Sequence, residues 1–95
     1  MHLEIITPEH KIFTGEVEAV QFPGIDGLFQ VLNNHAPIVS ALGKGIIKID
    51  LNSDFERNEK SSSLIEEDKN PKIIRVGIKG GVVEMLNNKV IVLAE

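Results

Sequence analysis

The stretch of residues 82–94, VVEMLNNKVIVLA, decides the fold class. Two apolar runs flank the pair Asn87-Asn88, and asparagine tolerates the left-handed backbone that a tight hairpin turn requires. In the second run the side chains fall alternately into two sets, which is the period of a strand. The first set is Val90, Val92 and Ala94, and the second is Ile91 and Leu93. The stretch therefore predicts a β-hairpin.

The same alternation, rich in β-branched residues, continues outward along the chain. It is found in residues 3–7, 47–51 and 74–78. Turn-forming pairs separate these runs, among them Pro23-Gly24 and Gly80-Gly81. We expect a bend at Gly15 to let one long strand, Lys11–Phe22, serve two sheets. The chain is predicted to be all-β, a flattened two-layer β-sandwich of short, mostly antiparallel strands.

The segment 52–72 interrupts this pattern. It holds six acidic and four basic residues, and Ser61-Ser62-Ser63 lies in its middle. A charged, serine-rich stretch is typical of solvated chain. We therefore predict a single domain, 1–95, with a long charged hairpin extension at 52–72 between the strands that contain Ile46 and Ile73. A docking role for other proteins is the alternative to a purely solvated tip.

Composition excludes several function classes. The net charge is −4 and the only aromatic residues are four phenylalanines, which argues against nucleic-acid binding. Cysteine is absent, so disulfides and thiolate metal sites cannot form. No run of about 18 apolar residues could span a membrane. The sequence thus predicts neither a nucleic-acid partner nor a membrane span.

Catalytic patterns are also sparse. The histidines His2, His10 and His35 lack the spacing of metal ligands, and the glycine pairs lack the residues of a phosphate-binding loop. We predict no catalytic residues, no metal and no cofactor. Two alternatives stay open: a hydrolase or metal enzyme built on Asp26 and His35, and a small oligonucleotide- or carbohydrate-binding barrel.

The run Phe22–Ile38, FPGIDGLFQVLNNHAPI, carries a more specific signal. Its glycines, its short strand and its His-Ala-Pro turn resemble the signature of the epsilon subunit of F-type ATP synthases, called delta in mitochondria. The matching positions are Gly24, Gly27, His35, Ala36, Pro37, Ile38 and Val39. The resemblance extends over nearly the whole chain except Asn52–Lys72.

This resemblance implies a non-catalytic subunit of the central stalk, in the rotor of the F1 sector. Such a subunit links the gamma subunit to the membrane c-ring and couples rotation to ATP synthesis or hydrolysis, and it has no small-molecule substrate of its own. The implied location is the cytoplasmic face of a bacterial inner membrane, peripheral and held there by the complex. In the ATP synthase such a chain would bind its neighbouring subunits and would carry no catalytic residues.

Two sets of contact residues follow from the resemblance. Loops at one end of the sandwich are expected to face the c-ring, and an apolar patch on one sheet is expected to face gamma. The ring-facing candidates are Gly24, Asp26, Gly27, Leu28, Asn33, Asn34, His35, Ala36 and Pro37. The gamma-facing candidates are Val20, Phe22, Ile91 and Leu93. For His35 the alternative is a hydrogen bond within its own loop.

Four departures from the family pattern bear on these expectations. Leu28 stands where some relatives have an acidic residue, and Gln30 stands where glycine is common. Asn33-Asn34 replaces a Pro-Gly type of turn, although asparagine can adopt the same backbone. The family usually continues into a C-terminal helical hairpin with a regulatory arm. This sequence stops at Glu95, so we expect coupling without that regulation.

Overall fold

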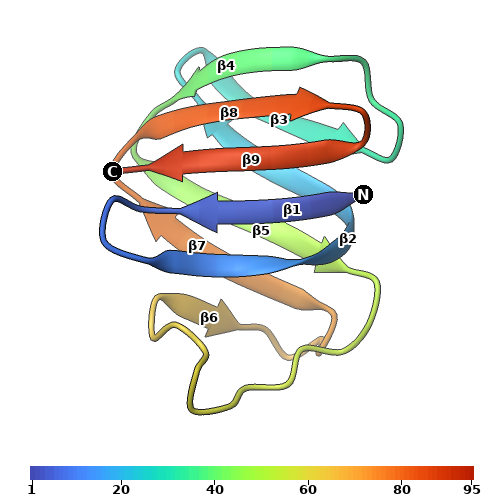
Figure 1. Ribbon diagram of the computed structural model, residues 1–95, viewed down its shortest axis with the longest axis vertical. Helices are drawn as coiled ribbons and strands as arrows, with labels where there is room; N and C mark the ends of the chain where they lie inside the picture. The colour runs from blue at the N-terminus through green and yellow to red at the C-terminus, as the bar shows by residue number, and fades with distance from the viewer.

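The computed structural model describes residues 1–95 as nine β-strands joined by turns and loops, without a helix (Figure 1). The strands are β1 His2–Ile6, β2 Lys11–Gly24, β3 Gly27–Leu32, β4 Ile38–Leu42, β5 Gly45–Leu51, β6 Ile65–Glu67, β7 Ile73–Ile78, β8 Gly81–Leu86 and β9 Lys89–Ala94. The all-β prediction is confirmed. The structure contains no helix that is long and apolar enough to cross a membrane.

The two layers of the sandwich are parts of one continuous sheet. Its strand order is β1-β9-β8-β4-β2-β5-β7-β6, with β3 paired to β2 and a further pairing between β1 and β2. Figure 1 shows β4, β8, β9 and β1 in front, with β3, β5 and β7 crossing behind them. Every pairing is antiparallel except β1 with β9. The predicted sandwich of mostly antiparallel strands is therefore present.

The strand β2 belongs to both layers. Its first half pairs with β1, and its second half pairs with β5 and β3. The irregularity that allows this change lies between Val17 and Ala19, where Glu18 has no partner on β5, and not at the predicted Gly15. An extra residue on one strand is the usual device that bends it and changes its twist.

The core is purely apolar. It contains 21 buried hydrophobic residues in one cluster, and no polar or charged side chain is buried. The period-two pattern explains this, because alternate residues of each strand face inward. Val90 and Val92 are fully buried, whereas Leu93 is 57% exposed, as the alternation in β9 predicts. The largest fully buried side chain, Phe22, packs against Phe29 with ring centroids 5.5 Å apart.

Asparagines form the tight turns. Asn87 and Asn88 have φ values of 52° and 60°, and Asn34 has a φ of 61°. Two consecutive residues with positive φ between paired strands are the hallmark of the tight hairpin turn that the sequence predicts. The hairpin β8–β9 therefore forms as expected.

The segment 52–72 is packed along the body of the domain and is more than a solvated tip. β5 and β7 pair directly, and within the connection the short strand β6 adds to the outer edge of β7. Ile65 is buried, and Phe55 packs against the core. The sequence did not predict this strand because its flanking residues are almost all charged or polar.

Candidate functional site

The β2–β3 turn is fixed by close contacts around a glycine. A Cβ on Gly24 would lie 2.7 Å from the carbonyl oxygen of Gly27 and 2.9 Å from the Phe29 ring. Gly27 has a φ of 127°, which side chains rarely tolerate. The resulting turn leaves Ile25 and Leu28 each 68% exposed. Two large apolar side chains therefore stand free at the tip.

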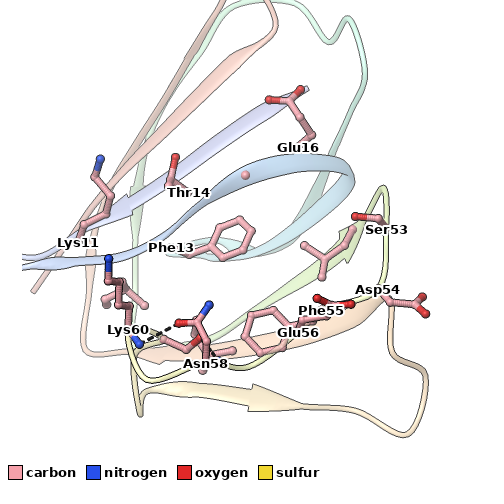
Figure 2. Close-up of a pocket in the computed structure, with 15 residues that line it drawn as sticks. Lys11, Phe13, Thr14, Glu16, Ser53, Asp54, Phe55, Glu56, Asn58 and Lys60 are labelled. Atoms are coloured by element: carbon pink, nitrogen blue, oxygen red, sulfur yellow. Dashed lines mark hydrogen bonds between the residues drawn. The ribbon is translucent and has the colours of Figure 1, made fainter.

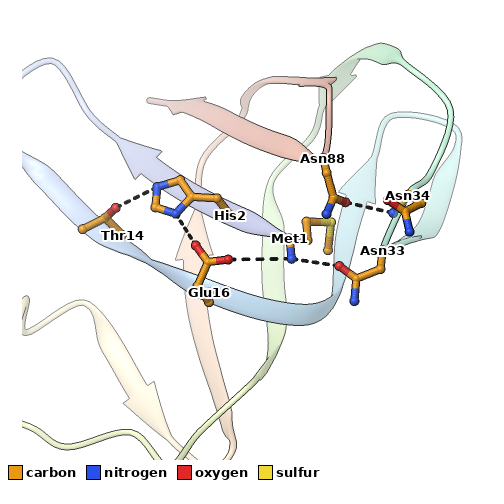
Figure 3. Close-up of polar contacts among 7 residues, drawn as sticks. All are labelled: Met1, His2, Thr14, Glu16, Asn33, Asn34 and Asn88. Carbon is orange, nitrogen blue, oxygen red and sulfur yellow. Dashed lines mark hydrogen bonds and ion pairs between the residues drawn. The ribbon is translucent and has the colours of Figure 1, made fainter.

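Polar side chains, in contrast, hold the loop between β3 and β4. The terminal ammonium of Met1 donates a 2.8 Å hydrogen bond to Oδ1 of Asn33, and the amide of Asn34 donates a 2.8 Å bond to Oδ1 of Asn88 (Figure 3). The amide of His35 donates to the Leu32 carbonyl at 3.1 Å. This loop is thereby tied to β1 and to the β8–β9 turn.

The side chain of His35 bonds within its own loop. Its Nδ1 lies 2.7 Å from the carbonyl oxygen of Ala36, and since a carbonyl only accepts, Nδ1 carries the proton. The alternative proposed for this residue is thus present. The ring is nonetheless exposed, which leaves Nε2 available to a partner.

The two loops expected to form one ring-facing end lie at opposite ends of β3, and which of them meets the ring stays a prediction. The strand between them has six residues, which span about 20 Å. In Figure 1 the β2–β3 turn lies on the side of the C-terminus and the β3–β4 loop on the side of the N-terminus. The amide of Gly43 bonds the Pro23 carbonyl at 2.8 Å, which joins the β2–β3 turn to the β4–β5 turn.

The four gamma-facing candidates also divide. Val20 and Phe22 are completely buried, so their side chains form no surface. Their alternation along β2 is displaced by the extra residue Glu18, and parity counted through that residue places side chains on the wrong face. Leu93 is exposed and Ile91 is half-buried, and both point outward from β9.

Further apolar side chains surround this pair. Val82 pairs with Leu93 across β8 and β9, and Ala41 pairs with Val82 across β4 and β8. Val39, on the outer side of β4, is 74% exposed. Ala41, Val82 and Leu93 form a contiguous apolar row, and in the next row Val39 and Ile91 lie on either side of Glu84. We call these five apolar residues the outer patch: Val39, Ala41, Val82, Ile91 and Leu93. Contiguous apolar patches on a small soluble domain mark interaction surfaces.

The geometry does not support the hydrolase alternative. Asp26 lies in the β2–β3 turn and His35 lies beyond the other end of β3, so the carboxylate cannot orient the imidazole. No group of three or more His, Asp and Glu side chains is placed to hold a metal ion.

Two polar clusters went unnoticed in the sequence. Nδ1 of His2 lies 2.7 Å from Oε2 of Glu16, and its Nε2 lies 3.3 Å from Oγ1 of Thr14 (Figure 3). On β7, Arg75 bonds Oδ1 of Asp68 at 2.7 Å, which with the amide of Asn70 holds the pKa of that carboxyl below its ordinary value. Only the pairing of strands brings these residues together.

Comparison with known proteins adds a family to this geometry. Residues 1–62 match the family described as ATP synthase, Delta/Epsilon chain, beta-sandwich domain. An ATP synthase epsilon chain of Chlorobium limicola is 37% identical over 93 residues, which are 98% of this chain and 86% of that protein. An epsilon chain of Campylobacter curvus is 37% identical over 95 residues, 100% of this chain and 60% of that protein.

Solved structures share the fold. One similar chain belongs to the central stalk and c-ring structure of the Tetrahymena thermophila mitochondrial ATP synthase. The similarity covers 99% of this chain and 62% of that chain, with a TM-score of 0.69 and 16% identity. A second similar chain belongs to the Euglena gracilis mitochondrial ATP synthase. The similarity covers 97% of this chain and 48% of that chain, with a TM-score of 0.72 and 19% identity. Together with the family match, these findings confirm the resemblance first seen in Phe22–Ile38: the chain belongs to the delta/epsilon chain family of ATP synthase.

Proposed function

We propose that this domain joins the gamma subunit to the c-ring in the central stalk and transmits rotation between them. The chain is a non-catalytic subunit of ATP synthase, related to epsilon chains over nearly its whole length. The observation that carries the proposal is the match of 98% of this chain to an epsilon chain of which it covers 86%. A sandwich with a continuous sheet and no buried polar side chain is suited to transmit rotation as a rigid body.

The gamma contact is proposed for the outer patch. Its exposed apolar side chains lie on three neighbouring strands, β4, β8 and β9, so they form a flat surface backed by the core. Burial of such a surface contributes about 25 cal/mol for each Å² of apolar area. Of the original gamma candidates, Ile91 and Leu93 remain in this proposal.

The ring contact is proposed for the β2–β3 turn, residues Gly24–Leu28. At its tip lie the apolar side chains of Ile25 and Leu28, which are largely exposed. The loop Asn33–Pro37 is tied to Met1 and Asn88 and lies at the other end of the sandwich. The ring and this loop would then be separated by the length of β3.

The complex is associated with the membrane, and we place this chain at the cytoplasmic face of a bacterial inner membrane. The relatives named above are bacterial epsilon chains. The contact with the membrane would be indirect, through the ring.

Cysteine cross-linking in the assembled complex tests both contacts, and the absence of native cysteine makes the chain suitable for it. Leu28→Cys should form adducts with c subunits, and Leu93→Cys should form adducts with gamma. His35→Cys and Lys60→Cys are matched exposed controls. Adducts of His35→Cys with c subunits and none from Leu28→Cys would refute the assignment of the ring-facing end.

A further inference from the structure

A groove runs between the first half of β2 and the connection that follows β5. It has a volume of about 460 Å³, and it is bounded by residues 11–16 on one side and by residues 53–61 on the other. In Figure 2 the rings of Phe13 and Phe55 and the side chain of Lys60 lie between the two walls, whereas the side chains of Thr14 and Glu16 point away from the connection. The groove exists because the connection is packed back along the domain.

The β2 wall is an open strand edge. β1 is the only strand paired with residues 11–16 of β2, so the other side of this half-strand has no ladder. The amide of Val17 donates to the Met1 carbonyl, and the carbonyl of Glu16 accepts from the Asn52 amide on the opposite side. Because bonding directions alternate in antiparallel pairs, the N–H and C=O of Thr14 and the N–H of Glu16 point into the groove. These groups are suited to receive another strand.

Aromatic side chains flank that edge. Phe13 comes from β2 and Phe55 from the connection, and each is partly buried against the core. The guanidinium of Arg57 lies 5.6 Å from the centre of the Phe55 ring and bonds Glu67 and the Ser62 carbonyl, which holds this wall in place. The groove thus has a fixed apolar seat between two rings.

Opposite charges occupy the two ends of the groove. In Figure 2 Lys11 and Lys60 lie at one end, whereas Glu16 and Asp54 lie towards the other. The distance along β2 from residue 11 to residue 16 is about 17 Å, the length of five residues in extended conformation. A segment with charges of opposite sign at its two ends would match both ends at once.

We propose that this groove binds an extended peptide segment of a partner protein, which adds as a strand antiparallel to β2. Its apolar residue lies between Phe13 and Phe55. A basic residue precedes it at the end of the groove where Asp54 lies, and an acidic residue follows it at the end where Lys11 and Lys60 lie. Main-chain bonds to an open edge supply affinity in this mode of recognition, and side-chain pockets supply specificity. The proposal goes beyond the coupling function and does not depend on it.

Titration of the isotope-labelled full chain with the capped peptide acetyl-Arg-Thr-Val-Thr-Glu-amide, followed by NMR, tests the proposal. Saturable shifts are expected at the amides of Thr14 and Glu16 and around Phe55. The charge-reversed peptide acetyl-Glu-Thr-Val-Thr-Arg-amide should bind about two- to five-fold more weakly for each mismatched charge. Shifts confined to other surfaces, or none that saturate up to the solubility limit, overturn the proposal.

Two variants sharpen this test. Thr14→Pro removes the backbone N–H that points into the groove, so peptide binding should be lost. The fold should persist, because proline is tolerated at strand edges. Lys60→Glu lies in the connection, outside every strand, and should weaken binding of the first peptide while improving that of the reversed peptide. Lys89→Glu, on β9, is the matched control and should leave binding unchanged. Equal binding by Lys60→Glu and Lys89→Glu would overturn the assigned direction. Because neither gamma nor the ring takes part, failure here is distinct from failure of the proposed function.

Discussion

The two ends of β3 are built in different ways. At the β2–β3 turn, backbone and rings lie so close to Gly24 that no side chain fits there, and no side-chain hydrogen bond contributes. At the β3–β4 loop, shape depends on two hydrogen bonds, which the Met1 ammonium donates to Asn33 and the Asn34 amide donates to Asn88. A turn defined by steric fit tolerates no added atom, whereas a loop defined by hydrogen bonds loses stability in small steps. The two ends should therefore respond differently to substitution.

The largest effect is expected from Gly24→Ala. The new Cβ would lie 2.7 Å from a backbone oxygen that cannot move freely, and overpacking of this kind costs about 1–3 kcal/mol. The melting temperature should fall by roughly 4–8 °C for each kcal/mol, measured by circular dichroism. Gly77→Ala is the control, because nothing lies within 4 Å of its Cβ position. Equal Tm values for the two variants would refute the steric account.

A smaller effect is expected from Asn88→Gly at the hydrogen-bonded end. Glycine keeps the positive φ, so the loss of stability isolates the bond that the Asn34 amide donates to Oδ1 of Asn88, which is worth about 0.5–1.5 kcal/mol. Asn87→Gly changes the neighbouring turn residue, for which no such side-chain bond is present, and should unfold at nearly the wild-type urea concentration. If both variants lose the same stability, the bond contributes nothing.

His35→Ala should change stability by less than about 0.5 kcal/mol, as is usual for exposed positions. Only a bond within the same loop is removed. A loss of more than roughly 1 kcal/mol in urea unfolding would mean that the loop depends on its histidine.

The smallest effect concerns Asp68, which belongs to neither end. Arg75 lowers the pKa of this carboxyl from its ordinary value of 3.8 in the folded chain. A depressed folded pKa stabilises above the unfolded value and loses that contribution as the pH falls through the folded value. The Asp68→Asn variant should therefore show a slightly flatter fall of Tm below about pH 4 than the wild type. Identical profiles of Tm against pH for the variant and the wild type would show that the Asp68–Arg75 ion pair makes no net contribution to stability.

The sequence predicted well whatever depends on local pattern. Asparagine pairs predicted the turn at Asn87, and alternation predicted that Leu93 points outward. It failed where one residue changed the register, because the unpaired Glu18 leaves Val20 and Phe22 inside. The opposite positions of the two loops follow from the six-residue strand β3 between them, because a strand of this length separates its two ends by about 20 Å.

The connection 52–72 shows a different limit. Arg57 holds it by bonds to the carbonyls of Ser62 and Ile65, and such bonds follow no periodic pattern. Charged composition correctly indicated exposure at most positions, since all but a few of these residues face solvent. It could not indicate that Phe55 would anchor the segment and create a groove.

The pairing of the first strand with the last has a consequence for synthesis. β1 lies beside β9, so one edge of β1 stays unsatisfied until residues 89–93 have left the ribosome. At about 5–20 residues per second, the growing chain carries this exposed edge for several seconds after β1 emerges. Closure of the sandwich is then a late event, and long-range pairings of this kind slow the search for the native state. A nascent-chain binding factor that shields β1 during this interval would protect it from pairing with a neighbouring polypeptide.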